Sequence, residues 1–400
     1  MKPIYIAAYH QSKFGKLMGM TVPQIVDAAI QGACAQVGVP ASALDVGSIG
    51  AACNFSLNHQ GLLAGVMAMT PGLEGKPIEA VENACASGGQ AVLSVVQKLQ
   101  LGLGDTGIAV GYEKMRDDAG KMDGKLIGEV LGYFSHPEER EGKLFVFPHI
   151  FAEVMRDYMA AYGVTEADLA AIAVQEYANA KYNSCAQMSK VRITLDQAMK
   201  IEGLNRYVVD ELPLKTYDCS QITDGYASLI LATEEGLAKL GVSKSDCVEI
   251  AGWGQATDPI RKAGRDVLHP TGAYRAMNAA YRMAGARAAD VNVAEVHDCF
   301  TVMGAIGTEV IGKAEPGRGA QYWVDGKARP DGECGINTSG GLIAKGHPIG
   351  ATGIAMIGWA ALQLQGKAPA ELQVKSPKLA ATFNIGGPIC ASVCTVLRRD

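Results

Sequence analysis

The chain has 400 residues, of which 48% are hydrophobic and 19% are charged, and its formal net charge is −5. A chain of this length and composition can bury a large core in two or three packed units. Lysine and arginine form no basic stripe, which excludes nucleic acid and anionic membranes as expected partners. The N-terminal apolar run is too short for a signal peptide or membrane span, so we expect a cytoplasmic protein.

Helical and strand-like patterns alternate from the N-terminus. Residues 21–38 have apolar positions every three or four residues, a threonine N-cap, an early proline and a closing glycine, which predicts an amphipathic helix. A strand-like segment follows at 45–53. The same order returns at 272–285, a helical pattern closed by glycine, and at 290–300, which again opens with Asp-Val and is typical of a strand.

A second pair of segments matches more closely. Residues 85–102, CASGGQAVLSVVQKLQLG, and residues 350–366, GATGIAMIGWAALQLQG, both open with four small residues and close on Leu-Gln and a glycine. A helix that is apolar all round is a buried one. Strand-like runs follow at 105–113 and 379–397. The chain is therefore expected to contain two similar α/β halves, each with a central buried helix.

Between the halves lies a segment that is richer in charge, tyrosine and methionine and lacks the repeated pattern. We assign residues 1–114 and 221–245 to the N-terminal half, 115–220 to an inserted domain, and 246–400 to the C-terminal half.

Cys85 is the first candidate for chemistry. At the first turn of a helix, free N–H groups and the helix dipole lower the pKa of a thiol and favour the nucleophilic thiolate. The alternative is a small residue that only packs, which is the usual role of the ten cysteines of this chain. Their spacing fits neither a zinc site nor a disulfide framework, so we expect no metal.

A catalytic cysteine needs a base, and the second half supplies candidates. His347 lies in a glycine-rich loop before the second buried helix, while His297 and Cys299 end a strand. If the halves pair about a dyad, these three residues converge on Cys85. A histidine can take the thiol proton or donate to an oxyanion, and a second cysteine can move a proton to or from carbon.

Five motifs in order resemble those of the thiolase superfamily over essentially the whole chain: CASG, SQITDGYAS, HDCF, GGLIAKGHPIGATG and NIGGP. The resemblance implies duplicated βαβαβαββ halves that form a five-layered αβαβα core, with a loop domain inserted in the first half. It implies that Cys85 carries the acyl group as a thioester and that His347 activates it. His297 and His347 would line one oxyanion hole, and the N–H groups of Cys85 and Gly386 a second.

Two positions depart from the commonest thiolases, which have Asn-Glu-Ala-Phe in place of His-Asp-Cys-Phe, and a catalytic cysteine at the position of Asn384. The pattern is similar to sterol-carrier-protein-type thiolases, in which the cysteine of His-Asp-Cys-Phe moves the proton. This implies that Cys299 is the acid/base group.

The implied activity is CoA-dependent acyl transfer: cleavage of a 3-oxoacyl-CoA by CoA, in the degradative direction, for a bulky, branched or aromatic acyl group such as that of benzoylsuccinyl-CoA. Three alternatives stay open. The first is an acetyl-CoA C-acetyltransferase that makes acetoacetyl-CoA, the second a ketoacyl synthase, and the third a non-catalytic scaffold or lipid-binding subunit.

Coenzyme A is expected as a substrate, with no permanently bound cofactor. Lys181, Lys190 and Arg192 in the inserted segment are candidate contacts for its phosphates, and could equally form a solvated charged surface. The resemblance implies a homodimer or a dimer of dimers. It also implies a possible small partner subunit with a zinc ribbon and an OB-fold.

Overall fold

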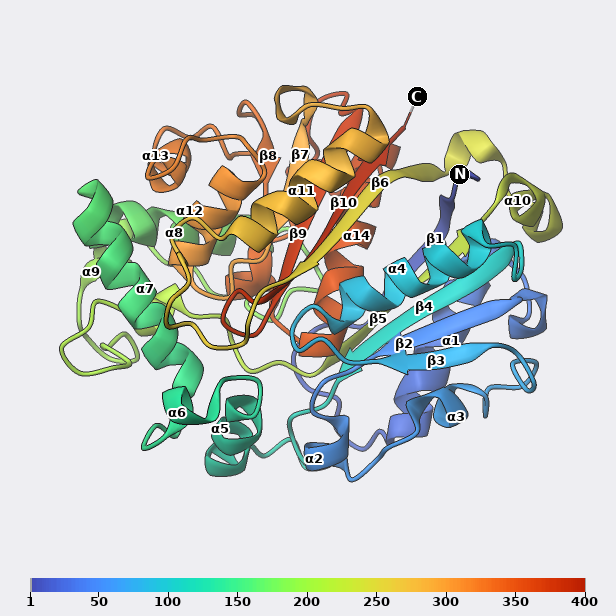
Figure 1. Ribbon diagram of the computed structural model, residues 1–400, viewed down its shortest axis with the longest axis horizontal. Coiled ribbons are helices and arrows are strands. Elements are labelled where there is room, and N and C mark those ends of the chain that lie inside the picture. Colours follow the sequence, from blue (N-terminus) through green and yellow to red (C-terminus); the bar gives the residue numbers. More distant parts are fainter. Residues whose placement is uncertain (1, 400) are drawn as a thin grey trace.

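Ten strands form one continuous mixed sheet in the computed structural model, which describes residues 2–399. The strand order is β3-β2-β4-β5-β1-β6-β10-β9-β7-β8 (Figure 1). The first half contributes β1 (Tyr5–Gln11), β2 (Val46–Gly50), β3 (Ile78–Val81), β4 (Thr106–Glu113) and β5 (Gly225–Ala232). The second half contributes β6 (Val248–Thr257), β7 (Val293–Val296), β8 (Gly335–Ile336), β9 (Leu379–Gly386) and β10 (Ala391–Arg398).

The two halves repeat one pairing scheme. In the first, β2 runs parallel to β3 and β4, and β5 runs antiparallel to β4 and β1. In the second, β7 runs parallel to β8 and β9, and β10 runs antiparallel to β9 and β6. Strands β1 and β6 join the halves by a short antiparallel pairing. The duplication expected from the sequence is confirmed.

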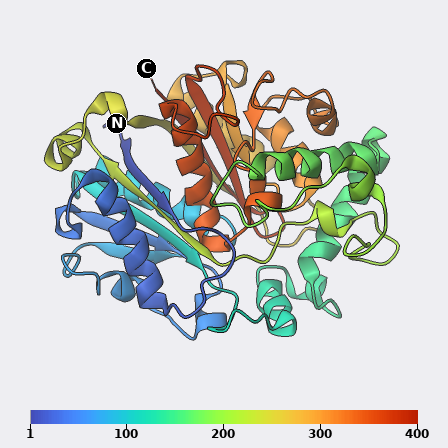
Figure 2. The same ribbon diagram turned by 180° about the vertical axis from the view of Figure 1, so that it is seen from behind.

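Helices occupy equivalent places in both halves and create five layers. Helix α1 (Val22–Val37) covers the outer face of the first half, and α11 (Thr271–Ala284) covers β6 and β10 of the second (Figures 1 and 2). Between the halves lie α4 (Ser87–Gln100) and α14 (Ile349–Gln365), which pack on each other and on strands of the sheet. Helix α1 has the predicted ends, a capping box at Thr21 and a left-handed Gly38.

Small residues let α4 and α14 approach closely. A Cβ atom added at Gly88 would lie 2.5 Å from the Gly350 carbonyl oxygen, and one added at Gly353 would lie 2.2 Å from the Gly89 nitrogen. Such contacts are too short for any side chain, so glycine is required where the helices cross. This crossing brings the N-termini of both helices to the middle of the molecule.

The remaining helices connect strands or form the segment between β4 and β5. The connecting helices are α2 (Asn54–Asn58), α3 (Leu63–Met67), α10 (Glu234–Leu240), α12 (Thr301–Val310) and α13 (Gly319–Val324). The segment between β4 and β5 carries α5 (Gly124–Gly132), α6 (Pro137–Arg140), α7 (Val146–Tyr162), α8 (Glu166–Ala180) and α9 (Leu195–Met199). Although it interrupts the first half, its helices α7 and α8 pack on α12 and α13 of the second half (Figure 1).

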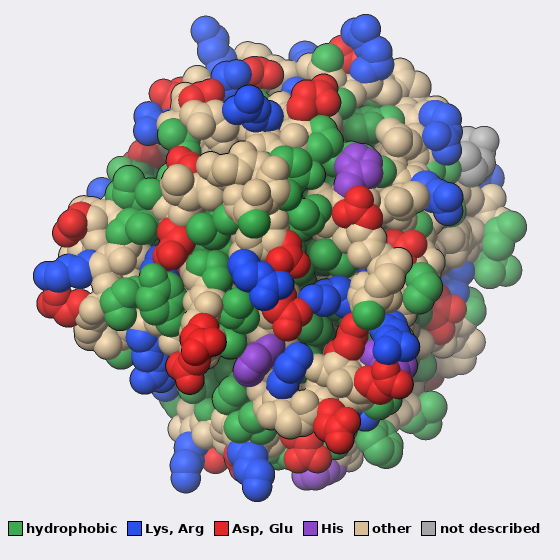
Figure 3. Space-filling model, turned by 60° about the vertical axis from the view of Figure 1, so that its left-hand side comes forward, with side chains coloured by type: hydrophobic (Ala, Val, Ile, Leu, Met, Phe, Trp, Pro, Cys, Tyr) green, Lys and Arg blue, Asp and Glu red, His purple; other side chains and the backbone are tan. Residues whose placement is uncertain are grey.

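The surface over this side of the molecule mixes charges of both signs with hydrophobic side chains (Figure 3). Within residues 2–399, no helix is both long enough and apolar enough to cross a bilayer.

Candidate active site

Four side chains from three separate segments meet over the N-termini of the two central helices. Cys85 precedes α4, and His297 and Cys299 lie between β7 and α12. His347 lies between the π-helix Gly341–Lys345 and α14. All four line one cavity. The convergence expected from the two-fold arrangement of the halves is therefore present.

The turn that carries Cys85 is held in an uncommon conformation. Ala84 has φ 47°, in the left-handed region that side chains rarely adopt. The Ser87 hydroxyl stabilises this turn, because it accepts from the Asn83 N–H (2.8 Å) and donates to the Ala84 carbonyl oxygen (2.6 Å). Helix α4 begins at Ser87, so Cys85 lies before the first helical turn and not within it as the sequence suggested.

The candidate reacting atoms lie close together. The Cys85 sulfur and a ring nitrogen from each of His297 and His347 are all within 4.8 Å of one another. The two imidazole rings are perpendicular, at an angle of 87° and with centroids 5.0 Å apart. Cys299, 7% exposed, lines the same cavity. One atom of a substrate could therefore contact the thiol and both histidines.

The hydrogen bonds of His347 assign its tautomer. The Thr352 hydroxyl donates its one hydrogen to the Pro348 carbonyl oxygen (2.9 Å), so it must accept from Nδ1–H of His347 (2.7 Å). The Nε2 atom then carries a lone pair. Burial, and next the charge of Lys345, lower the pKa of His347 to about 3. His347 is therefore a neutral imidazole with its acceptor nitrogen free to take a proton.

His297 has the opposite tautomer. The Asn384 side-chain nitrogen donates to the Cys85 carbonyl oxygen (3.0 Å), which fixes the orientation of the amide. The same nitrogen lies 3.0 Å from Nδ1 of His297, so Nδ1 must accept and Nε2 must carry the hydrogen. This Nε2 is buried and has no hydrogen-bond partner within residues 2–399. Burial and His347 lower the pKa of His297, so the neutral ring presents one N–H donor.

Cys85 is not activated by its helix in the resting state. Burial, and next the charges of Glu113 and Glu82, raise the pKa of its thiol to about 12, and an N–H bond from Gly387 opposes them only partly. The sequence expectation of a lowered pKa is wrong, because desolvation and nearby carboxylates outweigh the helix terminus. The resting site holds a neutral thiol beside a neutral base.

Glu113 is a buried acceptor for backbone N–H groups of both halves next to the site. Its carboxylate, fully buried, accepts N–H bonds from Ala52 (3.1 Å), Cys53 (3.0 Å) and Gly350 (3.1 Å). Gly350 is in the first turn of α14, so this carboxylate ties the two halves together where Cys85 and His347 meet.

Asp298 joins the loop of His297 to the segment before His347. Its carboxylate accepts from the N–H groups of Leu342 (2.8 Å) and Ile343 (3.1 Å) in the π-helix, and from the Asn337 side chain (2.7 Å). The position of each histidine therefore depends on the other's loop.

Sequence reasoning missed the supporting groups Thr352, Asp298 and Glu113. The first two stand inside the quoted motifs GATG and HDCF, which was the available signal. Glu113 ends a strand-like run and carried no such signal.

The other predicted residues lie in different places. Gly386 ends β9, and it is the next residue, Gly387, that lines the cavity. Lys181, Lys190 and Arg192 are at the surface and none of them lines the cavity within the described residues. Arg192 donates to backbone carbonyl oxygens of its own loop. Their role as phosphate contacts stays a prediction.

Cysteine and histidine are also zinc ligands, and three of them meet here. The donor set fits a metal poorly, because Nε2 of His297 carries a hydrogen for as long as Asn384 donates to Nδ1.

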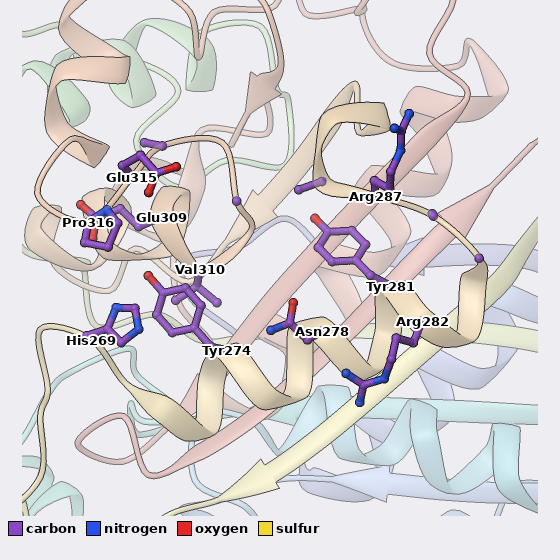
Figure 4. Close-up of a pocket in the computed structure, with 15 residues that line it drawn as sticks. His269, Tyr274, Asn278, Tyr281, Arg282, Arg287, Glu309, Val310, Glu315 and Pro316 are labelled. Atoms are coloured by element: carbon purple, nitrogen blue, oxygen red, sulfur yellow. The ribbon is translucent and has the colours of Figure 1, made fainter.

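A wider hollow of about 580 Å³ lies over α11 and shares no residue with the cavity at Cys85. His269, Tyr274 and Asn278 face Glu309 and Glu315 across it (Figure 4). Its lining contains no cysteine that could act as a nucleophile, whereas the cavity at Cys85 combines two cysteines with two histidines. The cavity at Cys85 is therefore the candidate active site.

The chain is similar to known proteins over nearly its whole length. The family described as "Thiolase, N-terminal domain" matches residues 4–235, and "Thiolase C-terminal domain-like" matches residues 254–399. An acetyl-CoA acetyltransferase of Methanothermobacter thermautotrophicus is 33% identical over 97% of both chains. Sterol carrier protein 2 of Bos taurus is 31% identical over 96% of this chain and 70% of its own. The benzoylsuccinyl-CoA thiolase subunit BbsB of Thauera aromatica is 29% identical, over 96% of this chain and 95% of its own.

Solved structures share the fold. The structure titled "Ltp2-ChsH2(DUF35) aldolase" superposes with a TM-score of 0.80 at 20% identity, covering 100% of this chain and 98% of that chain. Human mitochondrial 3-ketoacyl-CoA thiolase in complex with CoA superposes with a TM-score of 0.70 at 16% identity, covering 100% of this chain and 98% of that chain.

Proposed function

This chain belongs to the thiolase family and is an acyltransferase, and we propose that it cleaves a 3-oxoacyl-CoA with CoA through an acyl-enzyme on Cys85. The observation that carries the proposal is the pair of opposite tautomers around the thiol. His347 offers an acceptor nitrogen and His297 offers an N–H donor. A ring nitrogen of each histidine lies within 4.8 Å of the Cys85 sulfur.

The first half-reaction uses all four side chains. His347 takes the proton of Cys85 as the sulfur attacks the 3-oxo carbon, and the bond between C2 and C3 breaks. The electron pair moves into the enolate of the departing acyl-CoA, and Cys299 protonates C2. The N–H of His297 and the protonated His347 stabilise the negative charge that develops on the enolate oxygen.

The second half-reaction restores the site. The thiol of CoA gives its proton to the Cys299 thiolate and attacks the thioester carbonyl. The acyl group leaves as acyl-CoA, and the Cys85 sulfur takes back the proton held by His347. Each proton and each thiol returns to its starting place, so no oxidant, reductant or permanently bound cofactor is needed. The N–H groups of Cys85 and Gly386 are proposed to bind the tetrahedral oxyanion.

The second cysteine separates this proposal from its alternatives. A ketoacyl synthase that uses two histidines would tolerate loss of Cys299, and a scaffold or lipid-binding subunit would tolerate loss of all four groups. Synthesis of acetoacetyl-CoA is the second candidate activity, and the name of the M. thermautotrophicus relative favours it. It uses the same groups in the reverse direction.

Coenzyme A is proposed to bind against the segment between β4 and β5, with Lys181, Lys190 and Arg192 near its phosphates. We further propose a homodimer or a dimer of dimers and a small partner subunit with a zinc ribbon and an OB-fold. Residues 115–220 are proposed to form the inserted domain and residues 246–400 the C-terminal half. The partner is supported by the similarity to the Ltp2-ChsH2(DUF35) aldolase and to the thiolase subunit BbsB of T. aromatica.

The test is CoA-dependent cleavage of acetoacetyl-CoA and of longer or aromatic 3-oxoacyl-CoA thioesters, followed by chromatography of the products. We expect that Cys85→Ser abolishes the acyl-enzyme seen by mass spectrometry and that Cys299→Ala lowers kcat by roughly 10²–10⁴-fold. Cys247→Ala, a buried cysteine outside the cavity, is the matched control. Cleavage of no substrate, with or without a partner subunit, would leave the scaffold as the better explanation.

A further inference from the structure

The cavity beside Cys85 has an aromatic wall. Its lining includes five of the eight phenylalanines of the chain: Phe134, Phe145, Phe147, Phe151 and Phe300. Phe300 follows Cys299 directly and stacks on Phe151 of α7, with ring centroids 4.7 Å apart and an angle of 24°. Phe147 continues the row, 6.4 Å from Phe151. The wall therefore begins next to the sulfur that moves the proton and extends along α7.

The size of the cavity matches one ring. Its volume is about 170 Å³. An apolar cavity of about 150 Å³ in another protein accepts benzene. Flat aromatic walls favour offset-stacked and edge-to-face contacts with a further ring. A fused-ring system or a long chain would need the wall to open.

The lining carries no positively charged side chain that could pair with a carboxylate on the acyl group. Among the residues that line the cavity there is no lysine, arginine, aspartate or glutamate. Its ionisable groups are the two cysteines and two histidines, whose pKa values keep them neutral. A carboxylate that enters such a site is desolvated without a positively charged partner, which is unfavourable.

We propose that the acyl group transferred to Cys85 is an uncharged single-ring group, aromatic or alicyclic, and that substrates with a free carboxylate are disfavoured. The inference rests on the proposed thiolase activity. For an aryl substrate the reaction is 3-oxo-3-phenylpropanoyl-CoA plus CoA, giving benzoyl-CoA and acetyl-CoA. Phe147, at the partly exposed end of the wall, is the residue that sets how far the ring can extend.

The experiment compares kcat/KM of the wild-type chain for 3-oxo-3-phenylpropanoyl-CoA, acetoacetyl-CoA, 3-oxodecanoyl-CoA and the 2-carboxymethyl analogue of the phenyl substrate. We expect kcat/KM for the phenyl substrate to exceed that for each of the other three by at least about tenfold. A buried ring removes far more apolar surface from water than a methyl group, a long chain does not fit a cavity of about 170 Å³, and a buried carboxylate finds no positively charged partner.

Phe147→Trp fills the cavity and is expected to lower the ratio of kcat/KM for the phenyl substrate to kcat/KM for acetoacetyl-CoA by about tenfold or more. Phe55→Ala, at a residue that is 75% exposed and outside the cavity, is the matched control. Cleavage of acetoacetyl-CoA with no preference for the phenyl substrate, or equal use of the carboxylated analogue, overturns this inference and leaves the proposed activity standing. Cleavage of none of the four, with or without a partner subunit, overturns both. The wild-type panel decides even where a variant does not fold.

Discussion

Asn384→Asp tests the assignment of protons in the site. In the structure the Asn384 amide donates to Nδ1 of His297, which places the hydrogen of the ring on Nε2. A carboxylate has no hydrogen to donate, so Nδ1 must become the donor and Nε2 loses its hydrogen. The oxyanion site then loses its neutral N–H donor without any change in the size of residue 384.

The expected cost follows from that lost donor. Removal of one oxyanion-hole donor lowers kcat by roughly 10²–10³-fold, equivalent to about 2.7–4 kcal/mol of transition-state stabilisation. The new carboxylate also faces the Cys85 carbonyl oxygen, which loses its present hydrogen bond. A negative charge beside His297 raises its pKa, and the imidazolium form again carries a hydrogen on Nε2. The residual activity should therefore fall as pH rises through the new pKa.

The assay is kcat and KM for acetoacetyl-CoA cleavage between about pH 5 and pH 9, with the tautomer of His297 read from ¹⁵N chemical shifts. Asn278→Asp, at an exposed position on α11 outside the cavity, controls for the added charge. A variant that keeps kcat within about threefold of wild type would refute the reasoning, because the predicted loss is at least about a hundredfold. An Nε2–H tautomer in the neutral variant would also refute it.

Three further outcomes are expected. Alkylation of Cys85 by iodoacetamide should speed up about tenfold per unit between about pH 7 and pH 10, because the raised thiol pKa leaves little thiolate at neutral pH; a plateau below pH 8 would contradict this. Glu113→Gln should speed the same reaction at fixed pH by removing a charge that raises the thiol pKa, yet lower stability to urea by about 1–3 kcal/mol. Asp298→Ala should lower the free energy of unfolding, measured in urea, by about 3–5 kcal/mol, because Leu342, Ile343 and Asn337 lose a buried acceptor. A decrease of less than about 1 kcal/mol would count against this prediction.

The fold could be predicted from the sequence where its signals are local. The N-cap at Thr21 and the closing Gly38 were predicted from residues within one turn of the helix ends, and both are present. The two central helices were recognisable because a helix buried on all sides lacks polar residues. The duplication could be inferred from the matched order of these segments.

Properties that depend on distant residues could not be predicted. The pKa of Cys85 is raised by burial and by the charge of Glu113 at the end of β4, whereas the nearby helix terminus alone predicted a lowered pKa. The packing of α7 and α8 on the second half joins segments that are more than a hundred residues apart, and periodicity contains no information on which partner a helix face finds. Helix α4 begins two residues later than predicted, because the preceding Ala84 adopts a left-handed conformation. An alanine in the sequence gives no indication of that conformation.

The structure gives a physical reason why the two departures from the commonest thiolase pattern belong together. With His297 in place of asparagine, the ring needs a donor at Nδ1 so that its hydrogen faces the substrate, and the Asn384 amide supplies that donor. A cysteine at position 384 has one weakly polar hydrogen and could not serve both Nδ1 and the Cys85 carbonyl oxygen, as the two hydrogens of the amide can. Once asparagine occupies that position, the proposed mechanism needs another thiol that faces the cavity to supply the proton for C2. Cys299, two residues from His297, lines the cavity and is the thiol we propose for this step, so under this proposal histidine, asparagine and the displaced cysteine form one interdependent set.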